Sequence, residues 1–164
     1  MRKLVLAACL LAVAAPFVVR AADDAAPHHT AVKPDAVTWG PAPPVLPAGA
    51  QAAVLVGDPT KEGPFTIRLS APDGYRVPPH FHPTTENVTV ISGTFHIATG
   101  DTFDTTKGDA LAAGGFASLP AGMHHYAWME GPTVVQVHGT GPFALTYVNA
   151  ADDPRAAAEK PAKP

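Results

Sequence analysis

Short apolar runs recur along the middle of the chain, and most are rich in β-branched or aromatic residues. The runs cover residues 52–56, 65–69, 86–92, 94–98, 116–119, 125–128, 133–138 and 143–148. Turn-forming residues separate them at 57–59, 73–74, 100–101, 107–109, 114–115 and 130–132. Many short strands with Gly and Pro between them predict an all-β sandwich or barrel. One short helix is expected over residues 102–113, although Gly108 weakens it because glycine is unfavourable inside helices.

The amino terminus has the order of charged, apolar and small residues found in secretory signal peptides. Arg2 and Lys3 precede an apolar run over residues 4–19, and small residues follow. This order predicts cleavage after Ala21 and a mature protein in the periplasm or outside the cell. A transmembrane anchor is the alternative interpretation, but Pro16 interrupts the run, which is shorter than the ~20 residues of a membrane-spanning helix.

The rest of the chain divides into three segments. Residues 22–49 are rich in Pro and Ala and predict a linker followed by an extended lead-in, with His28 and His29 as solvated linker residues. Residues 50–150 are long enough for one domain with one hydrophobic core. Residues 151–164 lack large apolar side chains, so we expect a disordered tail.

Cysteine content and charge narrow the set of partners. Cys9 is the one cysteine of the sequence and lies in the predicted signal peptide, so the mature chain forms neither a disulfide nor a thiolate metal site. Loss of Arg2, Lys3 and Arg20 lowers the Lys and Arg count from 11 to 8 against 14 Asp and Glu, which gives a net charge near −6. We therefore expect no nucleic-acid partner and, after processing, no membrane partner.

The segment 74–93 concentrates the residues best suited to bind a metal. In a strand, His80 and His82 point to the same side about 7 Å apart and can bind one ion together. On a continued strand Glu86 would lie roughly 20 Å from His80, so the chain must turn between them. Pro83 and the two threonines after it favour such a turn, which places Glu86 on a second strand beside the first.

Glu86 shares its side of that second strand with Val88 and Val90, which are expected to face the core. A carboxylate that faces an apolar core is unfavourable unless it is paired. A bound cation would supply the partner, so the pattern links Glu86 to the same ion as the two histidines.

These residues resemble the first motif of the cupin superfamily. Its spacing is reproduced by Gly74, His80, His82, Glu86 and Gly93. The second cupin motif, whose histidine completes the metal site in that family, is resembled by Gly114, Pro120, Gly122 and His125. The resemblance implies a single-domain, type-2-like cupin, which is a small jelly-roll barrel or double-stranded β-helix. It further implies that one divalent transition metal is bound by His80, His82, Glu86 and His125.

The ligand set and one departure from the motif bear on the chemistry. Three imidazoles and a carboxylate suit Fe, Mn, Ni, Cu or Zn better than Ca or Mg, and the resemblance to other cupin sites places Fe or Mn first. Met129 stands where the family usually has an asparagine, four residues after the histidine of the second motif. We expect this change to affect the substrate class more than the metal.

Other polar residues near the motifs have more than one interpretation. His124 adjoins His125, and strand alternation directs it away from the metal, as a loop residue or as a residue that supports the ligands. Gln136 and His138 share one side of a strand and either face solvent or enter the cavity beside the ligands. His96 lies between two apolar residues and is expected to point outward.

Tyr126 and Trp128 fall on the opposite side of their strand from His125 and Ala127. Large aromatic side chains in such a position bury much surface. Their position predicts packing between sheets or at a homodimer contact rather than stacking on a substrate.

Two classes of function fit these residues. In the first, the protein is a metalloenzyme of an oxidoreductase, dioxygenase-like or isomerase-like kind that acts on a small organic molecule at open positions of the ion. Glu86 would then also be a catalytic residue that moves a proton when it loosens from the metal. In the second, the protein is a binding or sensor module that holds a metal or a small ligand without turnover. Nothing in the sequence names a substrate.

Overall fold

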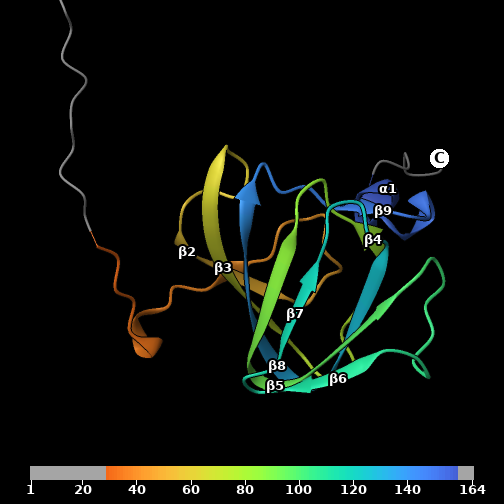
Figure 1. Cartoon of the computed structure of the whole chain (residues 1–164), viewed down its shortest axis with the longest axis horizontal. Helices are drawn as coiled ribbons and strands as arrows, with labels where there is room; N and C mark the ends of the chain where they lie inside the picture. The colour runs from red at the N-terminus through yellow and green to blue at the C-terminus, as the bar shows by residue number, and fades with distance from the viewer. Residues whose placement is uncertain (1–28, 159–164) are drawn as a thin grey trace, which may run out of the picture.

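The computed structural model describes residues 29–158 and folds them around one curled antiparallel sheet (Figure 1). The strands in chain order are β1 (Gly40–Pro41), β2 (Gln51–Val56), β3 (Gly63–Ala71), β4 (Arg76–Phe81), β5 (Glu86–Thr99), β6 (Asp109–Ala112), β7 (Phe116–Leu119), β8 (His125–Gly141) and β9 (Thr146–Tyr147). Short helical turns flank them: η1 (Pro34–Ala36), η2 (Ala150–Asp152) and α1 (Pro154–Ala158). The prediction of an all-β jelly-roll barrel is confirmed. The predicted signal peptide and His28 lie outside the described residues.

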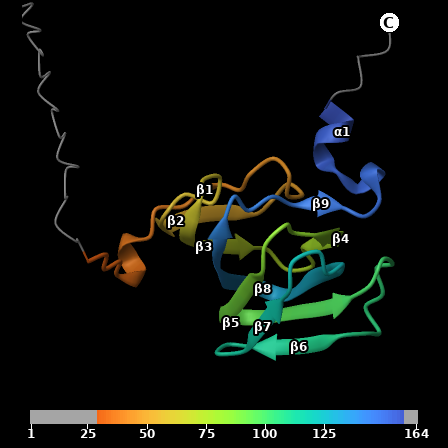
Figure 2. The ribbon, with the colours of Figure 1, turned by 45° about the horizontal axis from the view of Figure 1, so that its top comes forward.

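β5 and β8 are the two longest strands, and they pair with each other along most of their length. The first part of β8 also pairs with β4, and its last part pairs with β3. β5 pairs with β7 near its start and with β6 farther along. As a result β3 and β4 lie on one side of β8, and β5 to β7 lie on the other (Figure 2).

Glycines allow the two long strands to bend near their middle. Gly93 has a φ of +79° and Gly131 a φ of +72°, a left-handed conformation that side chains disfavour. A Cβ atom added at Gly93 would also collide with the carbonyl of Pro132 and with Thr133. The register between β5 and β8 shifts at this point, between Val90 and Thr94. The last glycine of the first sequence motif is therefore required for the bend that closes the barrel.

The core fills the interior with alternate residues of the long strands. Val88 and Val90 of β5 are register partners of Val137 and Val135 of β8, and Phe65 of β3 joins the same cluster. All five side chains are at most 2% exposed. Burial of each valine stabilises the fold by roughly 1.5–3 kcal/mol. The expectation that Val88 and Val90 face the core is confirmed.

The expected helix over residues 102–113 is absent, because residues 109–112 form β6 and pair with β5. In the preceding loop, the Asp104 carboxylate accepts hydrogen bonds from the backbone N–H and the hydroxyl of Thr106, at 2.9 and 2.6 Å. Side chains that bond to nearby backbone in this way compete with helix formation. Gly108 has a φ of +92°, and a Cβ there would collide with the backbone of Ile97. The helix prediction is wrong because the turn at Asp104 and the pairing of β6 with β5 hold this segment in other conformations.

The two ends of the described chain carry short elements. The expected extended lead-in contains η1 and β1, which pairs with β2. From residue 151, where the sequence predicts a disordered tail, the structure has the end of η2 followed by α1. Asn149 and Asp153 accept backbone N–H groups of Ala151 and Arg155, so local polar bonds hold these turns without a large apolar side chain. Within residues 29–158, no helix is both long and apolar enough to cross a membrane.

Candidate metal centre

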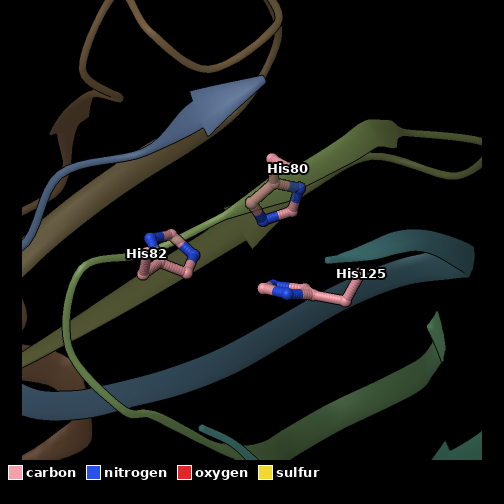
Figure 3. A group of neighbouring side chains, drawn as sticks. All are labelled: His80, His82 and His125. Carbon is pink, nitrogen blue, oxygen red and sulfur yellow. The ribbon is translucent and has the colours of Figure 1, made fainter. Parts of the chain in front are cut away.

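Three histidine side chains from two segments of the chain lie close together (Figure 3). His80 lies on β4 and is the register partner of His125, the first residue of β8, while His82 follows the end of β4. The ring centroids are 4.2 Å apart for His80 and His125 and 5.1 Å apart for His80 and His82. All three side chains are buried, and one nitrogen from each lies within 4.8 Å of the others. The histidines expected from the two motifs are therefore brought together.

Backbone carbonyls fix the orientation of each imidazole. Each Nδ1 atom lies within 2.7–2.8 Å of a carbonyl oxygen: that of Pro78 for His80, of Ala144 for His82 and of Met123 for His125. Because a carbonyl oxygen only accepts, each neutral ring must carry its hydrogen on Nδ1 and leave a lone pair on Nε2. The Nε2 atoms of His82 and His125 are buried and have no hydrogen-bond partner. Buried polar atoms of this kind are rare and indicate a missing ligand.

Glu86 lies at the same point as the three rings. Its Oε2 atom is 3.2 Å from Nε2 of His125 and 3.6 Å from Nε2 of His82. Burial by itself raises the pKa of Glu86, but the His125 ring 3.2 Å away and positive charge on the nearby imidazoles lower it overall. Neutral rings would instead turn lone pairs toward the carboxylate, so the site needs a positive partner at this point: a proton on an imidazole when no metal is bound, or a bound cation.

Burial also keeps the histidines in the form that binds metals. Burial, reinforced by the neighbouring His125 and His82, lowers the pKa of His80 to about 3. Burial likewise lowers the pKa of His82, although Glu86 opposes this. Metal binding requires neutral imidazole, so both rings are ready to bind near neutral pH.

The donors present fit a transition metal. Three neutral imidazole nitrogens and one carboxylate oxygen form a mixed nitrogen and oxygen set, which suits Fe, Mn, Ni, Cu or Zn. The Nδ1–H bonds to backbone carbonyls are the outer contacts that usually orient metal-bound histidines. The orphaned Nε2 atoms of His82 and His125 provide the structural evidence for this fit.

The loop of the second motif positions two of the histidines. The backbone N–H of Gly122 donates to the carbonyl of His82 at 2.8 Å, and Met123 closes a turn onto Pro120. The Met123 carbonyl in turn accepts from His125. The Pro-x-Gly-x-x-His spacing therefore places His82 and His125 together.

A segment that the histidine motifs did not indicate completes the surroundings of His82. The ring of Phe143 stacks on His82 with centroids 4.2 Å apart and planes 15° apart. The next residue, Ala144, supplies the carbonyl that orients His82. Histidine spacing did not indicate this segment, because it approaches from a distant part of the chain.

A cavity of about 330 Å³ opens beside the histidines and is lined mainly by apolar side chains. Val45 and Leu46 of the lead-in form part of its wall. The hydroxyl of Tyr147 donates to the carbonyl of Val45 at 2.8 Å, and that of Tyr75 donates to Pro47 at 2.6 Å. The expected linker and lead-in thus contributes to the site, which its Pro- and Ala-rich composition did not reveal.

His124 lies apart from the three buried rings. Its Nδ1 atom is 2.6 Å from the carboxylate of Asp101, its side chain is 39% exposed, and its ring stacks on Phe81. The structure therefore makes His124 a loop residue with its own surface partner.

Gln136 and His138 point away from the cavity. Their neighbours Val135 and Val137 line the cavity, whereas Gln136 accepts a hydrogen bond from Arg68 at 3.2 Å on the other face. The structure therefore agrees with the interpretation in which this pair points away from the cavity, because strand alternation directs Val135 and Val137 inward.

Tyr126, Trp128 and His96 also lie on the outer face. His96 stacks on Trp128, and its Nε2 atom is 3.0 Å from Glu130, so the outward direction expected of His96 is confirmed. Phe103 packs against both Tyr126 and Trp128. The aromatic pair thus packs within the chain, and a homodimer contact stays a prediction.

Comparisons with known proteins agree with this architecture. No curated protein matches the sequence. Among solved structures, a putative acetylacetone dioxygenase from Methylibium petroleiphilum has a TM-score of 0.61 at 21% identity, covering 80% of this chain and 88% of that one. The polyketide cyclase RemF from Streptomyces resistomycificus has a TM-score of 0.60 at 16% identity, covering 82% and 95%. An RmlC-like cupin from Ralstonia eutropha has a TM-score of 0.58 at 20% identity, covering 77% and 76%.

At these identities the similarity shows the fold alone, which is that of the cupins. A family model described as "Domain of unknown function (DUF4437)" matches residues 30–161, which is most of the chain. The chain is therefore a cupin-fold protein that belongs to the DUF4437 family.

Proposed function

We propose that the mature protein is a secreted or periplasmic cupin that binds one divalent transition metal and acts on a small organic molecule. The ligands are His80, His82, His125 and Glu86. The observation that carries the proposal is the convergence of oriented imidazoles, with the lone pairs of His82 and His125 left unpartnered next to an ionised, mostly buried carboxylate. Iron or manganese is our first expectation for the metal, followed by Ni, Cu or Zn.

The metal, when bound, supplies a Lewis acid toward an oxygen atom of the substrate. The chain contributes the surroundings in which this is effective. Backbone carbonyls hold each of the three rings in a fixed orientation, and the cavity beside them is lined mainly by apolar side chains. A substrate bound there would displace water, which strengthens electrostatic interactions at the site.

Glu86 is the candidate for proton transfer. It is the one Asp or Glu among the residues that line the cavity in the described part of the chain. Its Oε2 atom lies next to the imidazoles and also next to the space a substrate would occupy. A carboxylate in that place can accept a proton from a bound molecule.

Elemental analysis of protein purified from the periplasm tests the metal part of this proposal. We expect about one transition-metal ion per chain, and metal-free protein that takes up none on reconstitution would refute it. Assays of oxygen consumption and of product formation then test turnover. The neighbouring structures named for a dioxygenase and a cyclase make oxygen-dependent and ring-closing substrates the first panels. Metal-loaded protein that turns over no substrate would instead support a binding or sensor module.

Export is part of the proposal and has its own test. Amino-terminal sequencing of the soluble protein should begin at Ala22 or within a few residues of it. Soluble protein that retains Met1 would contradict export.

A further inference from the structure

The interior of the barrel is hollow beside the metal centre. The cavity volume is about 330 Å³. Pockets that bind small molecules commonly span about 300–1,000 Å³, so this cavity is at the small end. It therefore suits a compact molecule.

Apolar side chains form most of the cavity wall away from the metal centre. They include Ile67 and Leu69 of β3, Val77 of β4, Val88 of β5, and Met129 and Val137 of β8. Met129 occupies the position where the cupin motif usually has asparagine, and its side chain is 5% exposed. A thioether replaces an amide at this place, so the wall lacks a strong hydrogen-bonding group there.

Charged groups are scarce among the side chains that line the cavity. Apart from the histidines, Glu86 and Arg155 are its ionisable residues with a charge near neutral pH. The Arg155 guanidinium already binds the carboxylate of Asp153, with contacts of 2.6–3.1 Å. A second charge on a bound molecule would be buried without a dedicated counter-charge, which is strongly unfavourable.

The lead-in closes one wall and limits the size of the cavity. Val45 and Leu46 reach the cavity, and the hydroxyls of Tyr75 and Tyr147 hold this segment by its carbonyls. Burial raises the pKa of Tyr75 to about 12, so its hydroxyl remains a donor across the usual pH range. The wall is therefore fixed by two side chains of the barrel itself.

We propose that the cavity selects a compact molecule with one polar, metal-binding head and an uncharged apolar body. Binding of the polar head rests on the proposed function, because it requires a bound metal. Binding of the apolar body depends on the cavity alone, so each part can be tested without the other.

Calorimetric titration of protein loaded with Zn²⁺, which has no redox chemistry, measures how both the head and the body of a ligand contribute to affinity. The probes are linear alkyl hydroxamic acids from acetohydroxamic acid upward, which share one chelating head. We expect affinity to rise about fourfold for each added methylene until the cavity is full, and then to level off. A hydroxamic acid of equal length that ends in a carboxylate should bind at least tenfold more weakly than its methyl-ended partner. Affinity that does not depend on chain length, or that is equal for the two endings, would overturn the proposal.

A pair of variants locates the effect. Leu46→Ala widens the wall, so the levelling-off should move to a longer alkyl chain. Val54→Ala is the matched control, because Val54 is 60% exposed on β2 and does not reach the cavity. An unchanged profile for Leu46→Ala would show that the ligand does not use this cavity.

Protein that binds no metal would refute the proposed function and leave the apolar body to be tested alone. Thermal denaturation of the metal-free protein with toluene or with benzoate does this. We expect toluene to raise the Tm and benzoate to leave it unchanged. No shift with toluene, or an equal shift with both, would overturn the proposal. Metal-loaded protein that binds none of the hydroxamic acids would also overturn it while leaving the metal site intact.

Discussion

On each face of the sheet at β8, a histidine lies close to a carboxylate. The two pairs have similar distances but differ in burial. Inside the barrel, His125 and Glu86 are 3.2 Å apart, and their side chains are 2% and 12% exposed. Outside, His96 and Glu130 are 3.0 Å apart, but the Glu130 side chain is 75% exposed. Distance alone therefore does not identify a site. Burial and the fixed direction of the imidazole lone pair distinguish the metal centre from an ordinary surface pair.

The two pairs should therefore contribute differently to the free energy of folding. A solvent-exposed pair contributes about 0–1 kcal/mol, because water already stabilises both partners. The inner carboxylate has little water and needs a positive partner, which a metal ion at the imidazole nitrogens would supply. Substitutions on the two faces should therefore differ in the size of their effects.

Loss of one inner histidine should have the largest effect. We expect His82→Ala to abolish stoichiometric metal binding, because a ligand is removed from a set of four. A change in a residue that only supports the ligands typically lowers affinity ~10 to 100-fold, so the loss here should be greater. Metal per chain by elemental analysis measures it, and His96→Ala on the outer face is the control that should retain metal. Equal metal content in both variants would contradict the assignment.

Acid should destabilise the metal-free protein through the inner histidines. The pKa of His80 is about 3 in the folded protein against 6.5 for an ordinary histidine, so the unfolded chain binds the additional proton. The stabilisation is complete above about pH 6.5 and is lost as pH falls toward about 3, at up to about 1.4 kcal/mol per pH unit for one histidine.

Chemical denaturation of the metal-free protein between about pH 4.5 and 6.5 measures this slope, since most carboxylates titrate below that window. His80→Gln should reduce the slope. A slope unaffected by His80→Gln would show that His80 is not the group responsible.

Glu86→Gln should reduce both metal binding and stability. The neutral amide is a poor metal ligand, so stoichiometric metal should be lost. In the metal-free protein, the lowered pKa of Glu86 means that folding favours the ionised carboxylate, so its loss should also lower the free energy of unfolding near neutral pH, by about 1 kcal/mol. Denaturation with and without metal measures both effects. Higher stability of the metal-free variant would show that the carboxylate has no favourable partner without the metal.

Glu130→Gln gives the smallest expected change and serves as the outer counterpart of that variant. The contact with His96 is exposed, so the free energy of unfolding should change by less than about 1 kcal/mol, and metal content should not change. A large loss of stability would show that the outer pair contributes more free energy than an exposed ion pair usually does.

The sequence predicted the parts of the fold that depend on local pattern or motif spacing. Alternation on each side of the bend at Gly93 predicted these directions: Val88 and Val90 point inside, and His96, between the apolar Phe95 and Ile97, points outside, as the structure has them. Motif spacing brought His80, His82 and His125 together across two elements. Such patterns are informative because strand geometry converts spacing directly into direction.

The parts that the sequence did not predict depend on contacts between distant segments or on side-chain hydrogen bonds. The helix expected over residues 102–113 failed because the Asp104 side chain organises a turn and β6 pairs with β5. The cavity walls formed by Leu46 and Phe143 come from segments whose pattern gave no indication that they lie beside the metal centre. Only the folded chain brings them next to the histidines.

Two adjacent histidines, one in a surface loop and one directed to the interior, provide the most direct test of the metal centre. We compare metal per chain in His124→Ala and His125→Ala at one fixed pH. His124 pairs with Asp101 at the surface and His125 faces the inner carboxylate, so His124→Ala should keep one ion per chain and His125→Ala should lose it. If His124→Ala lost the metal and His125→Ala kept it, the strand register would be wrong by one residue. Tyr126 and Trp128 would then line the cavity in place of Ala127.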